Sequence, residues 1–183
     1  MVDLQSTRIP EVILLRPKIF GDDRGFFLES WHKRKFAEAG LDIEFVQDNH
    51  SRSVRNTLRG LHYQIQQPQG KLVQAITGTV FDVAVDLRKS SPTFGQWVGE
   101  TLSDRNHHQL WIPPGFAHGF LVLSEVADFS YKCTDYYAPE HERCIRWDDP
   151  ELGIDWPLGS GAAPIVSAKD AAGAALRTAE LFA

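Results

Sequence analysis

The sequence has few cysteines and no long apolar run. Only two of its 183 residues are cysteines, Cys133 and Cys144. Two thiols cannot build a disulfide framework, and they cannot supply all four ligands of a structural zinc site. The first ten residues lack the basic and then apolar pattern of a signal peptide, and no stretch approaches the length of a membrane span. These absences predict a cytoplasmic protein whose two thiols are buried and take no part in chemistry.

The sequence also lacks an excess of positive charge. Its 19 Lys and Arg residues against 24 Asp and Glu residues give a net charge of -5, which excludes a global basic field for nucleic acid. An anionic ligand would therefore need a local cluster of Arg and Lys. Hydrophobic residues make up 43% of the chain, enough for the core of one domain, and no repeat or linker divides it. We expect residues 1–183 to form a single domain.

Strand signals dominate the first 150 residues. Short stretches rich in β-branched and aromatic residues are separated mostly by Gly, Pro, Asn or Asp. The odd-numbered positions of 81–87 are apolar and should share one face, while Asp82 and Asp86 lie on the other. AITGTVFDV predicts a tight hairpin centred on Thr77 and Gly78. Many short strands at even spacing predict an all-β sandwich or closed barrel.

Two segments outside this pattern predict helices. Residues 32–40 (HKRKFAEAG) end at a suitable Gly cap, and residues 167–182 (SAKDAAGAALRTAELF) start with a capping box, Ser167 and Asp170. From spacing alone, Asp170 is expected to reach back to the helix start, and a catalytic role is the less favoured alternative.

Two stretches place polar side chains among apolar ones. LRGLHYQ (58–64) brings Arg59 close to His62, with Lys71 shortly downstream, and strand parity puts His62 and Gln64 on one side. A solvated edge strand is the alternative reading, but the combination favours a site. IPPGFAHGF (112–120) contains a Pro-x-Gly-x-x-His element similar to that of cupin jelly rolls, ending at His118. Because Gln64 stands where metal-binding cupins have a histidine, we expect no bound metal.

A third stretch, SYKCTDYY (130–137), is rich in tyrosine. Parity puts Tyr131 and Tyr137 on the same face, so one wall could carry both an acid and a stacking surface. The simpler explanation is that these tyrosines pack against the core and expose only their hydroxyl groups to water. The spacing does not decide between this structural role and a functional one.

Several long motifs together resemble the dTDP-4-dehydrorhamnose 3,5-epimerase family. They run in order from about Phe20 to about Asp170: FGDDRGFFLESW, FVQDNHSRS, LRGLHYQ, GKLVQAITGTVFDVAVDLR, SPTFGQWVGETLS, LWIPPGFAHGF and SAKD. The resemblance implies a cupin-like jelly-roll β-barrel with short peripheral helices, including a C-terminal one, that uses no metal or other cofactor. It also implies a homodimer in which an N-terminal segment of one subunit reaches the pocket of its neighbour, and no nucleic-acid or membrane partner.

The same resemblance implies a role for individual residues. The general base falls on His62, its orienting carboxylate on Asp170, the lysine near the sugar ketone on Lys71 and the opposite acid on Tyr131. Tyr137 falls on the aromatic residue that stacks on thymine. Further substrate contacts fall on Arg24, Glu29, Gln47, Asp48, Asn49, Arg59, His118, Glu142 and Lys169. The role of Glu142 rests on PEHERCIRW (139–147), the stretch that is least similar to the family.

The implied reaction is epimerisation of dTDP-4-dehydro-6-deoxy-D-glucose at carbons 3 and 5, a step of dTDP-L-rhamnose synthesis. Two alternatives compete with it: a related enzyme that epimerises only carbon 3 or moves the keto group to carbon 3, and a non-catalytic sugar-binding cupin. The presence of Tyr131 argues against the first, because a second inversion needs an acid on the face opposite the base. The combination of base, carboxylate, lysine and acid argues against the second.

Overall fold

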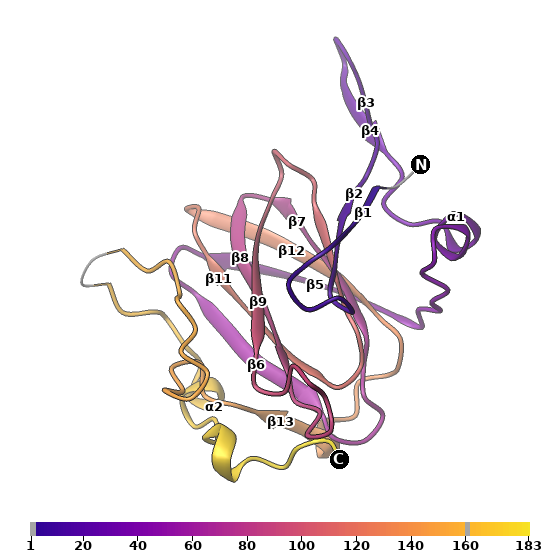
Figure 1. Cartoon of the computed structure of the whole chain (residues 1–183). Helices are drawn as coiled ribbons and strands as arrows, with labels where there is room; N and C mark the ends of the chain where they lie inside the picture. Colours follow the sequence, from indigo (N-terminus) through magenta and orange to yellow (C-terminus); the bar gives the residue numbers. More distant parts are fainter. Residues whose placement is uncertain (1–2, 160–161) are drawn as a thin grey trace.

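A computed structural model describes residues 3–159 and 162–183 of the chain. Two antiparallel sheets face each other, and a two-stranded hairpin extends from them (Figure 1). The six-stranded sheet contains, in spatial order, β1 (Asp3–Ser6), β2 (Ile13–Arg16), β10 (Gln109–Ile112), β7 (Lys71–Thr77), β12 (Val126–Cys133) and β5 (Gln47–Val54). The five-stranded sheet contains β13 (Glu142–Cys144), β6 (Leu58–Gln64), β11 (Phe116–Val122), β8 (Thr79–Asp86) and β9 (Trp97–Ser103). The hairpin is formed by β3 (Ile19–Asp22) and β4 (Gly25–Leu28).

The all-β prediction is confirmed, and neither sheet in the described part of the chain closes on itself. The predicted hairpin at Thr77 and Gly78 is wrong, because β7 and β8 belong to different sheets. Gly78, at a φ of 77°, instead carries the chain from one sheet to the other. A side chain there would collide with the Val126 carbonyl oxygen, 2.2 Å from the position of its Cβ.

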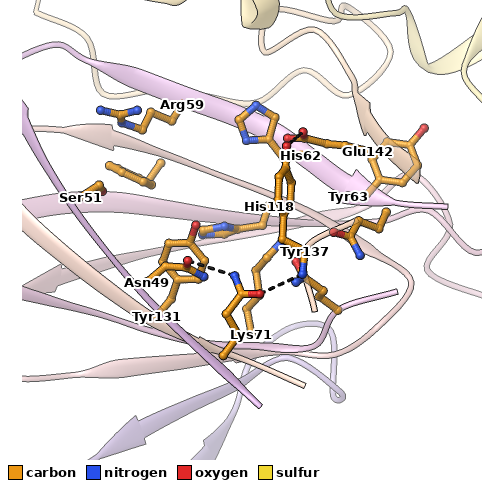
Figure 2. Close-up of a pocket in the computed structure, with 14 residues that line it drawn as sticks. Asn49, Ser51, Arg59, His62, Tyr63, Lys71, His118, Tyr131, Tyr137 and Glu142 are labelled. Carbon is orange, nitrogen blue, oxygen red and sulfur yellow. Dashed lines mark hydrogen bonds between the residues drawn. The ribbon is translucent and has the colours of Figure 1, made fainter. Parts of the chain in front are cut away.

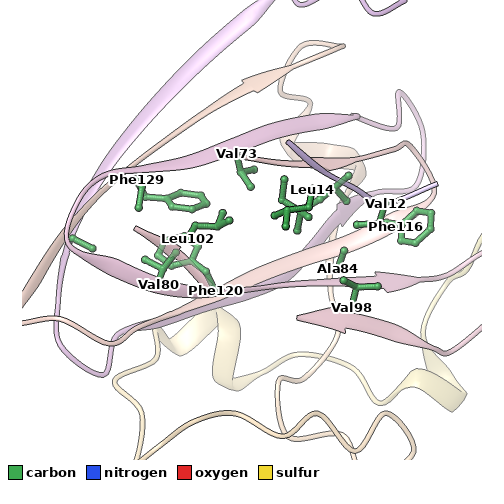
Figure 3. Packing of buried hydrophobic residues seen from close by; sticks show 14 of the residues in the cluster. Val12, Leu14, Val73, Val80, Ala84, Val98, Leu102, Phe116, Phe120 and Phe129 are labelled. Carbon is green, nitrogen blue, oxygen red and sulfur yellow. The ribbon is translucent and has the colours of Figure 1, made fainter. Parts of the chain in front are cut away.

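The main core lies between the two sheets (Figure 3). Val73 and Phe129 from the six-stranded sheet meet Ala84 and Phe120 from the five-stranded sheet, all of them buried. The predicted alternation along β8 is confirmed: Ala84 faces this core, while the odd-numbered positions face a second cluster under the C-terminal segment. Both faces of the five-stranded sheet are therefore covered, which holds its strands in place for the site described below.

The helices are short. The helix α1 (Lys33–Glu38) agrees with the prediction, and the ring of His32 accepts a hydrogen bond from Lys35 at its start. The long C-terminal helix is wrong: only α2 (Ala168–Ala171) and the 3-10 turn η2 (Leu176–Thr178) form, in addition to the 3-10 turn η1 (Pro139–His141). None of the helices in the described residues has the length and apolar character needed to cross a bilayer.

The helix α2 ends at Ala171 because the backbone that follows it forms hydrogen bonds with the segment at the end of β13. The amide of Ala174 donates to the Cys144 carbonyl, and the amide of Arg146 donates to the Ala174 carbonyl, both at 2.9 Å. Gly173 allows this approach, since a Cβ there would lie 2.7 Å from the Arg146 nitrogen. Pairing with a neighbouring strand thus outweighs the helix propensity of the alanine-rich segment.

Candidate active site

A pocket of about 350 Å³ opens between the two sheets at one end of the core (Figure 2). Side chains of both sheets line it, because inward-facing positions of β5, β7 and β12 lie across from those of β6, β11 and β13. Nine of the predicted site residues line this pocket: Gln47, Asn49, Arg59, His62, Lys71, His118, Tyr131, Tyr137 and Glu142. The sequence interpretation therefore identified nine of the fourteen residues that line this pocket.

His62 and Asp170 form a hydrogen-bonded pair. The Nε2 atom of His62 lies 2.6 Å from Oδ1 of Asp170, although the two residues are 108 positions apart in the sequence. Asp170 is buried on α2, and its backbone amide donates to the Ser167 hydroxyl. Burial raises the pKa of Asp170, but hydrogen bonds from His62, Ser167 and the Gly60 backbone outweigh it and hold that pKa below its usual value. An ionised Asp170 accepts the Nε2 proton and leaves Nδ1 of His62 free to act as a base.

A glycine pair sets the position of His62 in the sheet. The pairing of β6 with β11 aligns His62 with His118 and then shifts register before Phe120. Gly60 has a φ of 122° at this irregularity, and a Cβ there would lie 2.5 Å from the Cα of Gly119. Only glycine fits such a close approach, which explains why LRGLHYQ and AHGF each contain one.

Lys71 and Tyr131 face His62 from the opposite sheet. Both lie on the inner side of the six-stranded sheet, Lys71 at the start of β7 and Tyr131 on the neighbouring strand β12. Burial lowers the pKa of Lys71, and the Glu142 and Asp82 carboxylates oppose that shift. Burial also raises the pKa of Tyr131, which keeps its hydroxyl protonated. The pocket thus has an imidazole on one wall and a phenol with an amine on the other.

A second histidine–aspartate pair was missed by the sequence interpretation. Nε2 of His118 lies 2.9 Å from Oδ2 of Asp82, and the Asp82 side chain is fully buried. The other carboxylate oxygen of Asp82 has no hydrogen-bond partner among the described residues. Strand parity had placed Asp82 on the face of β8 opposite the odd-numbered apolar positions, but nothing in the sequence indicated that β8 pairs with β11 beside His118.

The mouth of the pocket carries a polar network. The Tyr137 hydroxyl donates to Oε2 of Glu142 at 2.5 Å, and Lys169 forms an ion pair with the same carboxylate. The hydrogen bond to Glu142 raises the pKa of Tyr137. Tyr137 is half exposed at this mouth. Arg59 lies on the rim, where its Nε donates to the Ser53 hydroxyl at 3.0 Å.

Three predicted contacts do not reach the pocket of their own chain. Arg24 is at the tip of the projecting hairpin and pairs with Asp22. Glu29 follows the hairpin and pairs with Lys35. Asp48 lies on β5 between two inward-facing residues, so alternation turns it outward, where it pairs with Lys132 at 2.9 Å. The structure brings none of these three to His62.

Five further residues line the pocket without having been predicted as contacts: Ser51, Tyr63, Gln64, Gln69 and Phe120. Gln64 had been noted on the same side of the strand as His62 and in place of a metal-binding histidine. Its amide nitrogen donates to the Gln67 and Tyr136 carbonyls, and its amide oxygen accepts from the Ala138 amide at 2.9 Å. Gln64 therefore anchors the turn that carries Tyr137, and its oxygen is already occupied.

Comparison with known proteins identifies the family of the chain. The family model described as dTDP-4-dehydrorhamnose 3,5-epimerase matches residues 6–178. The chain belongs to this family. A dTDP-4-dehydrorhamnose 3,5-epimerase of Pseudomonas aeruginosa is 65% identical over 182 residues, which cover 98% of this chain and 99% of the relative. Membership confirms the resemblance seen in the sequence and identifies the chain as an epimerase.

Two solved structures of the family extend the comparison to the fold. The dTDP-6-deoxy-D-glucose-3,5-epimerase of Legionella pneumophila, in complex with dTDP-4-keto-L-rhamnose, superposes with a TM-score of 0.95 at 56% identity and covers 98% of this chain and 95% of its own. A 3'-monoepimerase of Streptomyces bikiniensis in complex with dTDP-quinovose has a TM-score of 0.88 at 33% identity, covering 95% and 88%. The cupin-like jelly roll is thus confirmed, and the same fold occurs in a relative named for a single epimerisation.

Proposed function

We propose that the chain converts dTDP-4-dehydro-6-deoxy-D-glucose to dTDP-4-dehydro-L-rhamnose by inverting carbons 3 and 5, a step of dTDP-L-rhamnose biosynthesis. The observation that carries this proposal is the placement of the His62–Asp170 pair on one wall of the pocket and of Tyr131 on the other. Inversion at a carbon needs a base and an acid on opposite faces of the sugar. The high identity to a 3,5-epimerase over nearly the whole chain also supports it.

In this mechanism His62 removes the proton from the carbon next to the ketone. The electron pair of the broken C–H bond moves to the ketone oxygen and gives an enolate. Lys71, as an ammonium, donates to that oxygen, and such stabilisation of developing charge is usually the largest single contribution to the rate. Tyr131 then protonates the same carbon from the other face. His62 and Tyr131 exchange protons with solvent before the second carbon reacts.

The two aspartates fix the histidines for these roles. Asp170 accepts the Nε2 proton of His62 and stabilises the imidazolium that forms when Nδ1 takes the proton of the substrate. Asp82 holds Nε2 of His118 in the same way, which directs the other ring nitrogen of His118 at the pocket. We assign to His118 a hydrogen bond to the substrate next to the one from Lys71.

The nucleotide end of the substrate is assigned to the mouth of the pocket. The half-exposed ring of Tyr137 is suited to stack on thymine. Guanidinium groups pair bidentately with phosphate oxygens, so Arg59 on the rim is suited to the diphosphate. Gln47, Asn49, Glu142 and Lys169 lie at or beside this mouth.

Arg24 and Glu29 keep their predicted roles only if the protein is a homodimer. The hairpin projects from the sandwich (Figure 1), and Phe26 and Phe27 on it are 61% and 68% exposed. A projecting apolar hairpin with an arginine at its tip is suited to reach the pocket of a second copy. We propose that Arg24 and Glu29 serve the neighbouring subunit, and that the chain acts as one cytoplasmic domain without nucleic-acid or membrane partners.

We also propose that the reaction needs no metal or other cofactor. The chemistry moves only protons, and the amide oxygen of Gln64 is engaged by the Ala138 amide rather than free to coordinate an ion. A carboxamide is in any case a poor ligand for late first-row metals.

Product analysis in D2O tests the proposal against its alternatives. The enzyme should place deuterium at both carbon 3 and carbon 5 of dTDP-4-dehydro-6-deoxy-D-glucose and yield the doubly inverted sugar. The His62→Ala variant should place deuterium at neither carbon. Deuterium and inversion at carbon 3 alone would indicate a mono-epimerase, and the absence of any exchange by the native protein would indicate a binding protein.

A further inference from the structure

Cys144 lies beside the His62–Asp170 pair and has no part in the proposed mechanism. It is one of two free cysteines, and it is half buried, whereas Cys133 is fully buried on β12. The prediction that both thiols are buried is therefore confirmed for Cys133 and wrong for Cys144. In the pairing of β13 with β6, Cys144 stands directly opposite His62, so both side chains project from the same face of the sheet.

The three side chains form a compact set of ligand atoms. A ring nitrogen of His62, the sulfur of Cys144 and a carboxylate oxygen of Asp170 all lie within 4.8 Å of one another. Tetrahedral zinc sites have ligand bonds of about 2.0 to 2.3 Å, which places their ligand atoms roughly 3.3 to 3.8 Å apart. The three ligand atoms therefore lie near the spacing of a zinc site.

The donor set has a clear chemical preference. Imidazole, thiolate and carboxylate together suit Zn²⁺ and its analogues Co²⁺ and Cd²⁺, whereas Mg²⁺ and Ca²⁺ require oxygen ligands. Three protein ligands and one open position are also the pattern of zinc sites that exchange a water or small ligand. The anionic thiolate and Asp170 would balance the charge of the divalent cation, while the neighbouring Lys169 and Glu142 neutralise each other.

We propose that His62, Cys144 and Asp170 form an inhibitory site for zinc or a similar thiophilic divalent cation. The cation enters from the pocket, which His62 lines, and replaces the proton shared between His62 and Asp170. The Cys144 thiol loses its proton to solvent as the S–metal bond forms. The inhibitory consequence depends on the proposed epimerase function, but the binding itself does not.

Binding at either ring nitrogen removes the general base. A cation on Nδ1 occupies the lone pair that would accept the substrate proton. A cation on Nε2 displaces the proton held by Asp170, so the neutral ring must carry its proton on Nδ1 instead.

Cobalt binding tests the site independently of catalysis. Titration of the full-length native protein with Co²⁺ should produce the near-ultraviolet band of thiolate-to-cobalt charge transfer. Cys144→Ser should lose the band, and Cys133→Ser, the matched control at the other thiol, should keep it. Calorimetric titration with Zn²⁺ should show binding to the native protein that weakens at least about a hundredfold in Cys144→Ser, since even outer-shell partners of a metal site are worth 10- to 100-fold.

Epimerisation assays in the presence of Zn²⁺ test the inhibition. The native enzyme should lose activity as the site fills and recover it when a chelator is added, while Cys144→Ser should be active and resist the same zinc concentration. A missing cobalt band in the native protein, or equal zinc inhibition of native enzyme and Cys144→Ser, would overturn the proposal. A protein that shows the band but no epimerase activity would refute the proposed function and leave the metal site standing.

Discussion

The replacement of Tyr131 by phenylalanine separates the acid from the base in the proposed mechanism. The ring of Tyr131 packs against the main core, and its hydroxyl forms no hydrogen bond with another described residue. Its removal therefore leaves no buried partner unsatisfied, and the free energy of unfolding should change by less than about 1 kcal/mol. Circular dichroism during urea unfolding measures this change.

The catalytic effect should be much larger than the effect on stability. General acid catalysis is typically worth about a hundred- to ten-thousandfold in rate, or roughly 3 to 5 kcal/mol of transition-state stabilisation. His62 and Asp170 are untouched by the substitution, so the variant should still remove the substrate proton and return one to the same face. Tyr131→Phe should then exchange deuterium from D2O into the substrate while forming little inverted product.

The assay follows deuterium by NMR and the product by chromatography in the same reaction. Tyr136→Phe is the matched control, because this exposed tyrosine lies on the same segment and does not line the pocket. It should exchange and invert at the native rate. Native yields of doubly inverted sugar from Tyr131→Phe would show that water or another side chain supplies the proton. The assignment of Tyr131 as the acid opposite His62 would then be wrong.

Four further predictions concern other parts of the molecule. Dialysis against a strong chelator should leave the rate unchanged, and a loss that added zinc, manganese or iron restores would contradict the metal-free mechanism. Mixing inactive Arg24→Ala and inactive His62→Ala subunits should restore activity, because one pocket of each mixed dimer is then intact; verified mixed dimers without activity would rule out shared sites. Asp82→Asn should reduce kcat by up to about a hundredfold and alter its pH profile, since His118 loses the partner that orients its ring, and an unchanged profile would deny Asp82 that role. Burial raises the pKa of Asp86, but hydrogen bonds from Arg88, Ser91 and Thr93 outweigh it and hold that pKa at about 2, below its usual 3.8. The stabilisation of the fold by ionised Asp86 is therefore present above about pH 4 and lost as the pH falls towards 2. Asp86→Asn should cost roughly 2 kcal/mol at pH 7 by urea unfolding, and a cost that persists unchanged at pH 2 would contradict this account.

Features that depend on local pattern could be predicted from the sequence. The alternation along 81–87 and the short helix at 32–40 follow from the period of a strand and from a glycine cap, and both are present. The pairing of His62 with Asp170 came from family resemblance, while spacing alone favoured a capping role for Asp170. In the structure the carboxylate serves His62, and it is the Ser167 hydroxyl that caps the helix.

Features that depend on partners distant in the sequence could not be predicted. The hairpin expected at Gly78 and the long C-terminal helix both fail because another part of the chain offers the backbone better partners. For the same reason Asp82 was seen only as a polar position on a strand. Its function depends on which strand lies next to β8, and that neighbour is fixed by the three-dimensional packing of the two sheets.

The location of the acid and the base on separate sheets has a consequence for how such enzymes diversify. A substitution on β12 can abolish or move the acid without changing the strand that holds His62, and changes around β6 leave the phenol in place. Proton removal and the choice of face for reprotonation can therefore be altered one at a time during evolution. A scaffold with this division can change the stereochemistry of its product while it retains the same carbon acid chemistry.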